Sequence, residues 1–136
     1  SDQALDGNTF SGSGDAVVRA AMTQLGVPYK WGGETPGVGF DCSGLVQWSY
    51  AQIGVSLPRT TSEQVLVGVP VTDVADLRPG DLVFTRSSRN GTVIDRGHVA
   101  IYAGGGKEVV APKTGDVVSV RPVVYSGIQA AQRVLS

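Results

Sequence analysis

The stretch 39-GFDCSGLVQW-48 contains the only cysteine of the chain, Cys42, where a polar segment gives way to an apolar helical pattern. Asp41 stands where the N-cap of that helix is expected, so Cys42 falls in the first turn. Unpaired N–H groups and the helix dipole favour negative charge there, which predicts a thiol with a lowered pKa and a larger thiolate fraction. Two plainer interpretations stay open: Cys42 is a small buried hydrophobe, and Asp41 is only a cap.

The single histidine, His98, begins an apolar run directly after Gly97. A cysteine nucleophile needs a base to take its proton, and a histidine brought near by the fold is the usual arrangement in thiol hydrolases. A structural role is the alternative for a lone histidine. One Cys and one His are too few for a zinc site, which takes three or four protein ligands. We therefore predict neither a metal nor a cofactor.

The chain has 136 residues, about the length of one domain, and 41% of them are hydrophobic. Its 11 basic and 12 acidic residues give a net charge of −1, without the basic surface typical of nucleic-acid binding. No apolar run is long enough to span a membrane, and a single cysteine forms no internal disulfide. Residues 1–14 are rich in Ser, Gly and Asp; we interpret them as the remnant of a linker from a longer protein, followed by one domain over 15–136.

Helical patterns dominate the first half of the chain. The expected elements are a helix over 13–26, capped by Ser13 and stopped by Gly26, a turn-rich loop over 27–40, a helix over 42–53 and a short helix within 60–68. The buried face of the first helix is predicted to hold Val17, Ala20, Ala21 and Leu25. That of the second is predicted to hold Leu45, Val46, Ser49 and Ile53, in line with Cys42.

Strand patterns dominate the second half. We expect a turn and a short strand within 77–85, a polar loop over 86–97 with an Asn-Gly turn, two strands over 98–105 and 107–112 joined by glycines, a strand over 117–123 and a closing strand or helix over 130–135. Helices followed by antiparallel strands indicate the α+β class, with N-terminal helices packed on an antiparallel sheet.

The run 28-PYKWGGETPGVGFDCSGLV-46 strongly resembles the NlpC/P60 cysteine peptidases, whose hallmark is Tyr-x-Trp-Gly-Gly followed by Asp-Cys-Ser-Gly-Leu. The resemblance continues, in the family's order, through 57-LPRTTSEQ-64, 77-LRPGDLVF-84 and 98-HVAIY-102. It covers most of the chain from about Asp15 onward and looks most like the actinobacterial cell-wall endopeptidases. The resemblance implies a papain-like core, a secreted or cell-envelope location, and peptidoglycan stem peptides as the partner; protein partners and the oligomeric state are left open.

The same resemblance implies hydrolysis of peptidoglycan stem peptides, typically between D-γ-glutamyl and a diamino acid such as meso-diaminopimelate. Cys42 would attack the scissile carbonyl, and His98 would take the thiol proton and return one to the leaving amine. The backbone N–H of Cys42 would donate to the oxyanion. Tyr29, Asp41 and Ser43 look like substrate-side residues; alternatively, Tyr29 is a packed aromatic and Ser43 only a first-turn residue.

One departure from the family concerns the third polar residue, which orients the catalytic histidine and precedes an Ala-Pro pair. In 107-KEVVAP-112 that position holds Val110, which cannot accept a hydrogen bond from the imidazole. Glu108 lies two residues earlier, on the same side of a strand, and is our candidate third catalytic residue. A water or a backbone carbonyl is an equal alternative. We therefore expect an enzyme that is weak or conditional.

The loop over 85–97 looks longer than in close relatives of the family and carries Arg86, Arg89 and Arg96 just before His98. It could rim the cleft and bind carboxylates of the stem peptide, or be a solvated surface loop. Two other functions stay open. One is a peptidoglycan-binding module with little or no catalysis, and the other is a thiol amidase or acyltransferase acting on another substrate.

Overall fold

A six-stranded antiparallel sheet carries the fold, in the strand order β5-β10-β6-β7-β8-β9. The computed structural model describes residues 4–5 and 9–136. The strands of this sheet are β5 (Val69–Pro70), β6 (Leu82–Arg89), β7 (Thr92–Gly104), β8 (Lys107–Val110), β9 (Ser119–Pro122) and β10 (Ile128–Arg133). Two small hairpins pair β1 (Ala4–Leu5) with β2 (Thr9–Phe10) and β3 (Glu34–Thr35) with β4 (Gly39–Phe40).

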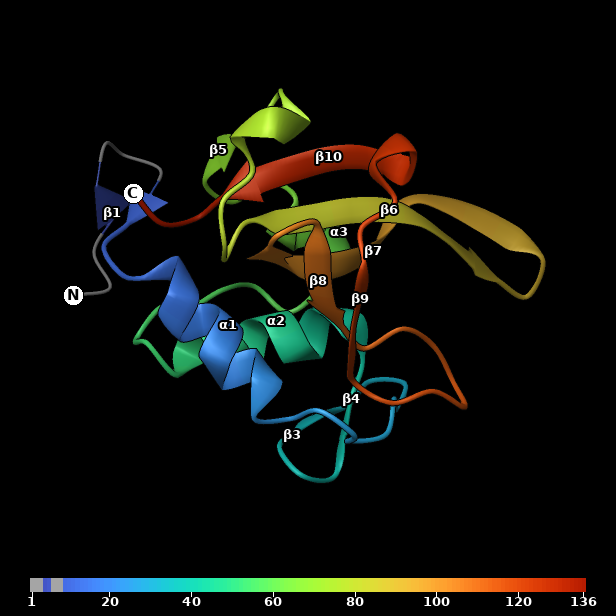
Figure 1. Cartoon of the computed structure of the whole chain (residues 1–136). Coiled ribbons are helices and arrows are strands. Elements are labelled where there is room, and N and C mark those ends of the chain that lie inside the picture. Colours follow the sequence, from blue (N-terminus) through green and yellow to red (C-terminus); the bar gives the residue numbers. More distant parts are fainter. Residues whose placement is uncertain (1–3, 6–8) are drawn as a thin grey trace.

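The helices are α1 (Gly14–Met22), α2 (Cys42–Ala51) and α3 (Thr61–Gln64), with single 3-10 turns η1 (Val74–Asp76) and η2 (Tyr125–Gly127). Helices α1 and α2 cover one face of the sheet (Figure 1). Their buried side chains form the main core with Phe84 of β6 and with Val99 and Ile101 of β7. A smaller cluster of Val83, Tyr102 and Val123 covers the opposite face. The predicted α+β class is confirmed.

Helix α1 begins where the sequence predicts. The Ser13 hydroxyl accepts a hydrogen bond from the backbone of Ala16 at 3.3 Å, as an N-cap should. The predicted buried face is partly wrong, because the helix ends at Met22 and leaves Leu25 44% exposed in the following turn. Val18 takes its place in the core.

Helix α2 begins at Cys42, and the Asp41 carboxylate caps it by accepting from the backbone of Gly44 at 2.7 Å. A Cβ at Gly44 would lie 2.1 Å from the carbonyl oxygen of Gly33, so only glycine lets this first turn pack so closely on the preceding loop. Leu45, Val46 and Ser49 are buried as predicted. The Asp41 cap and the close packing of Gly44 on Gly33 together fix the first turn of α2, and with it the position of the Cys42 side chain.

The expected polar loop over 86–97 is wrong: these residues continue β6 and β7 into a hairpin, with Arg89 opposite Thr92. The predicted Asn-Gly turn is present, with φ of 51° at Asn90 and 78° at Gly91, the left-handed values of a tight hairpin turn. Figure 1 shows this ribbon projecting beyond the rest of the sheet. Its outer part has both faces exposed, so no alternation of apolar residues marks it in the sequence.

The chain ends in a strand, β10, which settles the choice left open for 130–135. The predicted linker over 1–14 falls partly on residues 1–3 and 6–8, outside the described residues. Within it, Phe10 donates to the Val134 carbonyl at 2.8 Å and accepts from the Ser136 amide at 2.9 Å. Within the described ranges, no helix combines the length and apolar character needed to cross a bilayer.

Candidate active site

Cys42 and His98 line one cavity of about 710 Å³. Its walls come from four parts of the fold: the loop over 29–32 with the start of α2, the segment before and within α3, the β6–β7 hairpin, and the loop that follows β8. The lining residues are Tyr29, Trp31, Gly32, Asp41, Cys42, Ser43, Arg59, Thr60, Thr61, Ser87, Ser88, Arg89, Asn90, Gly97, His98, Pro112, Lys113 and Thr114.

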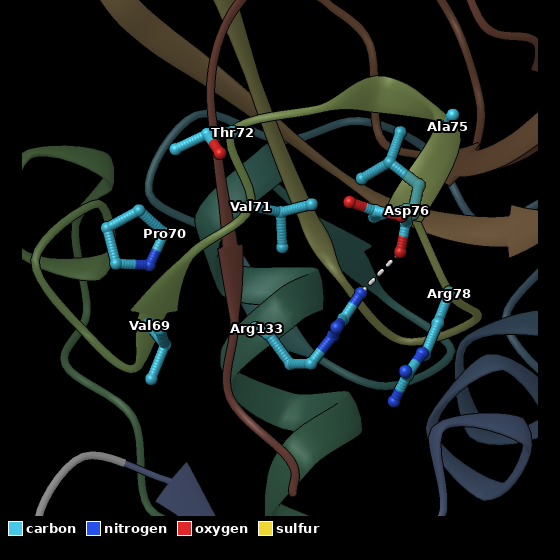
Figure 2. A pocket seen from close by; sticks show the side chains of 9 residues that line it. Val69, Pro70, Val71, Thr72, Ala75, Asp76, Arg78 and Arg133 are labelled. Carbon is cyan, nitrogen blue, oxygen red and sulfur yellow. Dashed lines mark hydrogen bonds between the residues drawn. The ribbon is translucent and has the colours of Figure 1, made fainter.

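A second cavity of about 550 Å³ lies between β5, η1 and the end of β10 (Figure 2). Arg133 points across it and donates to the Asp76 carbonyl at 2.6 Å, while its other contacts go to the carboxylate of Asp81. No cysteine or histidine lines this cavity. Its arginine ties strands together, so the Cys42 cavity is the candidate active site.

The Cys42 thiol is half-buried and has a raised pKa, contrary to the lowered value expected at a helix start. Burial is the main cause, and the nearby Asp41 carboxylate adds to it. The backbone N–H groups of Ser43 and Cys42 at the helix start, and that of Val99 on β7, lower the pKa but do not outweigh burial. The resting group is therefore a neutral thiol that needs a base.

His98 is 9% exposed at the inner end of the hairpin, opposite Thr85 of β6. Since the amide of the next residue, Val99, acts on the Cys42 thiol, the start of α2 and this part of β7 adjoin. Burial, and then the charge of Arg121, lower the pKa of His98 to about 4. The imidazole is therefore neutral at neutral pH and keeps one nitrogen able to accept a proton.

Sequence reasoning missed Arg121. Its Nη2 lies 3.4 Å from Nε2 of His98, and its Nε donates to Glu108 at 2.8 Å. Glu108 is buried, and among the described contacts its carboxylate reaches His98 only through Arg121. Val110 is fully buried opposite Ser119 and supplies no polar group. The sequence holds no local signal for this pair. Glu108 and Arg121 are cross-strand partners, and their contact follows only from the register in which β8 and β9 pair.

The Asp41 carboxylate accepts further hydrogen bonds besides the one that caps the helix. Both of its oxygens accept from Arg59, at 2.9 Å each, and Arg59 also donates to Glu34 at 2.6 Å and to the Ser43 hydroxyl at 2.9 Å. Gly32 donates to Asp41 at 3.2 Å. Asp41 and Ser43 do line the cavity, but this network holds their side chains in place, and a buried bidentate pair is rigid.

Tyr29 lies half-buried in the cavity wall, and burial followed by Cys42 raises its pKa, so its hydroxyl stays protonated and can both donate and accept. Arg89 of the hairpin also lines the cavity and stacks on the Trp31 ring, 3.5 Å from its centroid. Of the three arginines predicted to rim the cleft, Arg89 alone lines it, because Arg86 points to Asp95 instead. Lys113 adds a second cation.

The architecture is papain-like: an α+β domain in which helix α2 carries a cysteine at its start and packs on a sheet that carries a histidine. A family model described as "NlpC/P60 family" matches residues 26–134. The chain belongs to the NlpC/P60 family, as its motifs predict.

Among curated proteins, a "probable endopeptidase" of Mycobacterium tuberculosis is 44% identical over 116 residues, covering 85% of this chain and 28% of the relative. The "murein DD-endopeptidase MepH" of Escherichia coli is 41% identical over 101 residues, 73% of this chain and 36% of the relative. The chain thus spans about a third or less of the length of these two relatives.

Solved structures agree with the fold. A family protein from Bacillus cereus superimposes with a TM-score of 0.80 at 32% identity, covering 93% of this chain and 41% of that one. The NlpC/p60 domain of the peptidoglycan hydrolase SagA gives 0.75 at 35% identity, covering 90% of this chain and 99% of that domain.

Proposed function

We propose that this domain is a peptidoglycan endopeptidase, acting in the cell envelope or outside the cell, that cuts stem peptides at a D-γ-glutamyl–diaminopimelate type bond. The observation that carries the proposal is that Cys42 and His98 line one cavity in a domain whose relatives are named as endopeptidases and peptidoglycan hydrolases.

In this mechanism the neutral His98 imidazole takes the proton of the Cys42 thiol, and the sulfur attacks the scissile carbonyl carbon. The N–H of Cys42, at the unpaired start of α2, donates to the oxyanion that forms. The imidazolium then protonates the leaving amine as the C–N bond breaks, which leaves a thioester on Cys42. Water, deprotonated by His98, hydrolyses the thioester and restores the thiol.

The charges of the cavity favour an anionic substrate. Arg59 is neutralised by Asp41 and Glu34, whereas Arg89 and Lys113 have no ion pair among the described residues. Stem peptides of the diaminopimelate type carry free carboxylates, which two unpaired cations at a cavity rim would attract. Tyr29, Asp41 and Ser43 form the wall nearest the nucleophile and are proposed to contact the substrate.

The test is mass spectrometry of purified diaminopimelate-type muropeptides after incubation with the domain, with Cys42→Ala as the control. New fragments from the wild-type protein alone would identify an endopeptidase and the bond it cuts. Cys42→Ser and His98→Ala should each lose nearly all turnover, and Glu108→Ala far less. If either of the first two variants keeps most of its turnover, the proposed mechanism is wrong.

A peptidoglycan-binding module is the second candidate, because Val110 leaves the imidazole without the usual acceptor and the thiol is neutral at rest. Intact muropeptide retained by both wild type and Cys42→Ala, without fragments, would favour it. Fragments that appear only as adducts of added amines would indicate an acyltransferase instead.

A further inference from the structure

The group that contacts the His98 imidazole is an arginine from the neighbouring edge of the sheet. Arg121 on β9 places Nη2 3.4 Å from Nε2 of His98. Its Nε is held at 2.8 Å by Glu108, which comes from β8 and is 5% exposed. The cross-strand register sets Glu108 directly opposite Arg121, so the pair is built into the sheet.

An arginine acts on a histidine differently from a carboxylate or an amide. A guanidinium only donates hydrogen bonds, so the Nε2 atom that faces it has to be the unprotonated, accepting nitrogen. A neutral imidazole has one such nitrogen, and its proton therefore lies on Nδ1. An acceptor in the same place would select the other tautomer, with the proton on Nε2.

We propose that Arg121 is a positioning residue that keeps His98 in the Nδ1–H tautomer with its accepting nitrogen occupied, and that this contact has to break before His98 can take the Cys42 proton. Arg121 has to leave whichever ring nitrogen faces the thiol. Uptake of the proton at Nε2 requires Arg121 to leave. Uptake at Nδ1 requires the resident proton to move to Nε2, which again requires Arg121 to leave.

The geometry also indicates a restraint that can be released. A separation of 3.4 Å is long for a hydrogen bond, and the Arg121 side chain is 41% exposed, so its Nη2 can move off the imidazole while its Nε keeps the bond to Glu108. The charge of Arg121 opposes the imidazolium, the nearby Glu108 carboxylate is paired with Arg121, and the Cys42 thiol is uncharged. The inference about the tautomer stands alone; its kinetic consequence rests on the proposed function.

The chain has one histidine, so its imidazole nitrogens give one set of NMR signals. Long-range ¹H–¹⁵N spectra of the ¹⁵N-labelled domain should show the Nδ1–H tautomer in the wild type. Arg121→Gln supplies an acceptor and removes the charge. It should move the population towards Nε2–H and raise the midpoint of the His98 titration. The double variant Glu108→Gln/Arg121→Gln leaves no unpaired buried carboxylate and serves if the single variant does not fold.

Arg121→Lys keeps the charge without the planar fork and should retain the wild-type titration better than Arg121→Gln. Arg19→Gln, on the exposed side of α1, is the matched control and should leave the His98 signals unchanged. On a muropeptide substrate, Arg121→Gln should raise turnover near neutral pH about threefold to tenfold, the cost of breaking one hydrogen bond.

An Nε2–H tautomer in the wild type, or spectra and titration unchanged by Arg121→Gln, would overturn the proposal. So would lower turnover in Arg121→Gln with an intact fold. If no variant cleaves any muropeptide but the tautomer changes as expected, the proposed function fails while the role of Arg121 at His98 stands.

Discussion

At Cys42 two local effects oppose each other, and the sequence reveals only one of them. Asp41 and the apolar pattern after it correctly locate the first turn of α2, whose N–H groups lower the thiol pKa. The opposing effect, burial, comes from packing against the main core, to which strands far along the chain contribute Val99 and Ile101. The residue and its position could be predicted, but its protonation state required the packed structure.

The raised pKa predicts slow alkylation of Cys42. At pH 7.5 iodoacetamide should modify the folded domain at least about fivefold more slowly than a free thiol such as N-acetylcysteine, because the thiolate is the reacting species. The rate should climb as pH rises beyond the ordinary thiol range. Intact-mass spectrometry follows the single adduct, and the urea-unfolded chain should react at the free-thiol rate. A folded domain that reacts faster than the free thiol would mean that a thiolate exists at rest.

The low pKa of His98 predicts a loss of stability in mild acid. The folded pKa is about 4, below the ordinary value of 6.5, so the unfolded chain binds the proton first as pH falls. The stability present above pH 6.5 is therefore lost between about 6.5 and 4, and no further loss from this group occurs below that. The shift corresponds to roughly 3 kcal/mol.

Urea unfolding of wild type and His98→Gln at several pH values isolates this contribution, because the Asp and Glu carboxylates titrate equally in the two proteins. The difference in unfolding free energy should change across the window from pH 6.5 to 4 and stay constant above it. A difference that is independent of pH would contradict the burial of a neutral imidazole.

At the scale of elements, the β6–β7 hairpin shows why pattern reading succeeds for some strands and fails for others. Residues 98–102 form a continuous buried run, and their strand was predicted correctly. Residues 86–97 belong to the same two strands, yet most of them are exposed and their polar sequence resembles a loop. The Asn90-Gly91 turn was the one local signal that the sequence offered, since both residues adopt positive φ.

The hairpin predicts a selectivity for carboxylates. Arg89 has no ion pair within the described part of the chain, stacks on the exposed Trp31 ring and lines the cavity. Arg89→Ala should therefore raise KM for muropeptides with free carboxylates about threefold to tenfold. For the same substrates with amidated carboxylates, Arg89→Ala should raise KM much less. Arg86→Ala, on the same strand but paired with Asp95, is the matched control and should leave both KM values unchanged. An equal rise in KM for both substrates would show that Arg89 supports the fold or the position of Trp31 and does not bind the substrate carboxylate.

At the scale of the whole molecule, features set by neighbouring residues could be predicted from the sequence, and contacts between distant strands could not. The order of helices and strands, the α+β class and the starts of the first two helices follow from caps and periodicity near each element, whereas both helices end earlier than predicted. What the sequence did not reveal depends on pairing between distant strands: Glu108 with Arg121 across β8 and β9, and Asp81 with Arg133 across the start of β6 and β10. Both are ion pairs in which the carboxylate is buried, and both were invisible without the register of the sheet.

The Asp81–Arg133 pair leads to a prediction about the whole fold. Asp81 is 3% exposed, accepts from Arg133 at 2.8 and 3.1 Å, and also accepts from the backbone of Arg78 at 2.8 Å. Arg133→Met leaves that carboxylate buried with fewer donors, so the variant should lose about 3 kcal/mol of unfolding free energy, seen as a lower Tm. Asp81→Leu/Arg133→Met removes both charges and should regain part of the loss. The pair lies outside the Cys42 cavity, so at a temperature where the protein is folded, turnover per folded molecule should match wild type. If the double variant is less stable than Arg133→Met, the backbone contact to Arg78 carries the stability, and the ion pair does not.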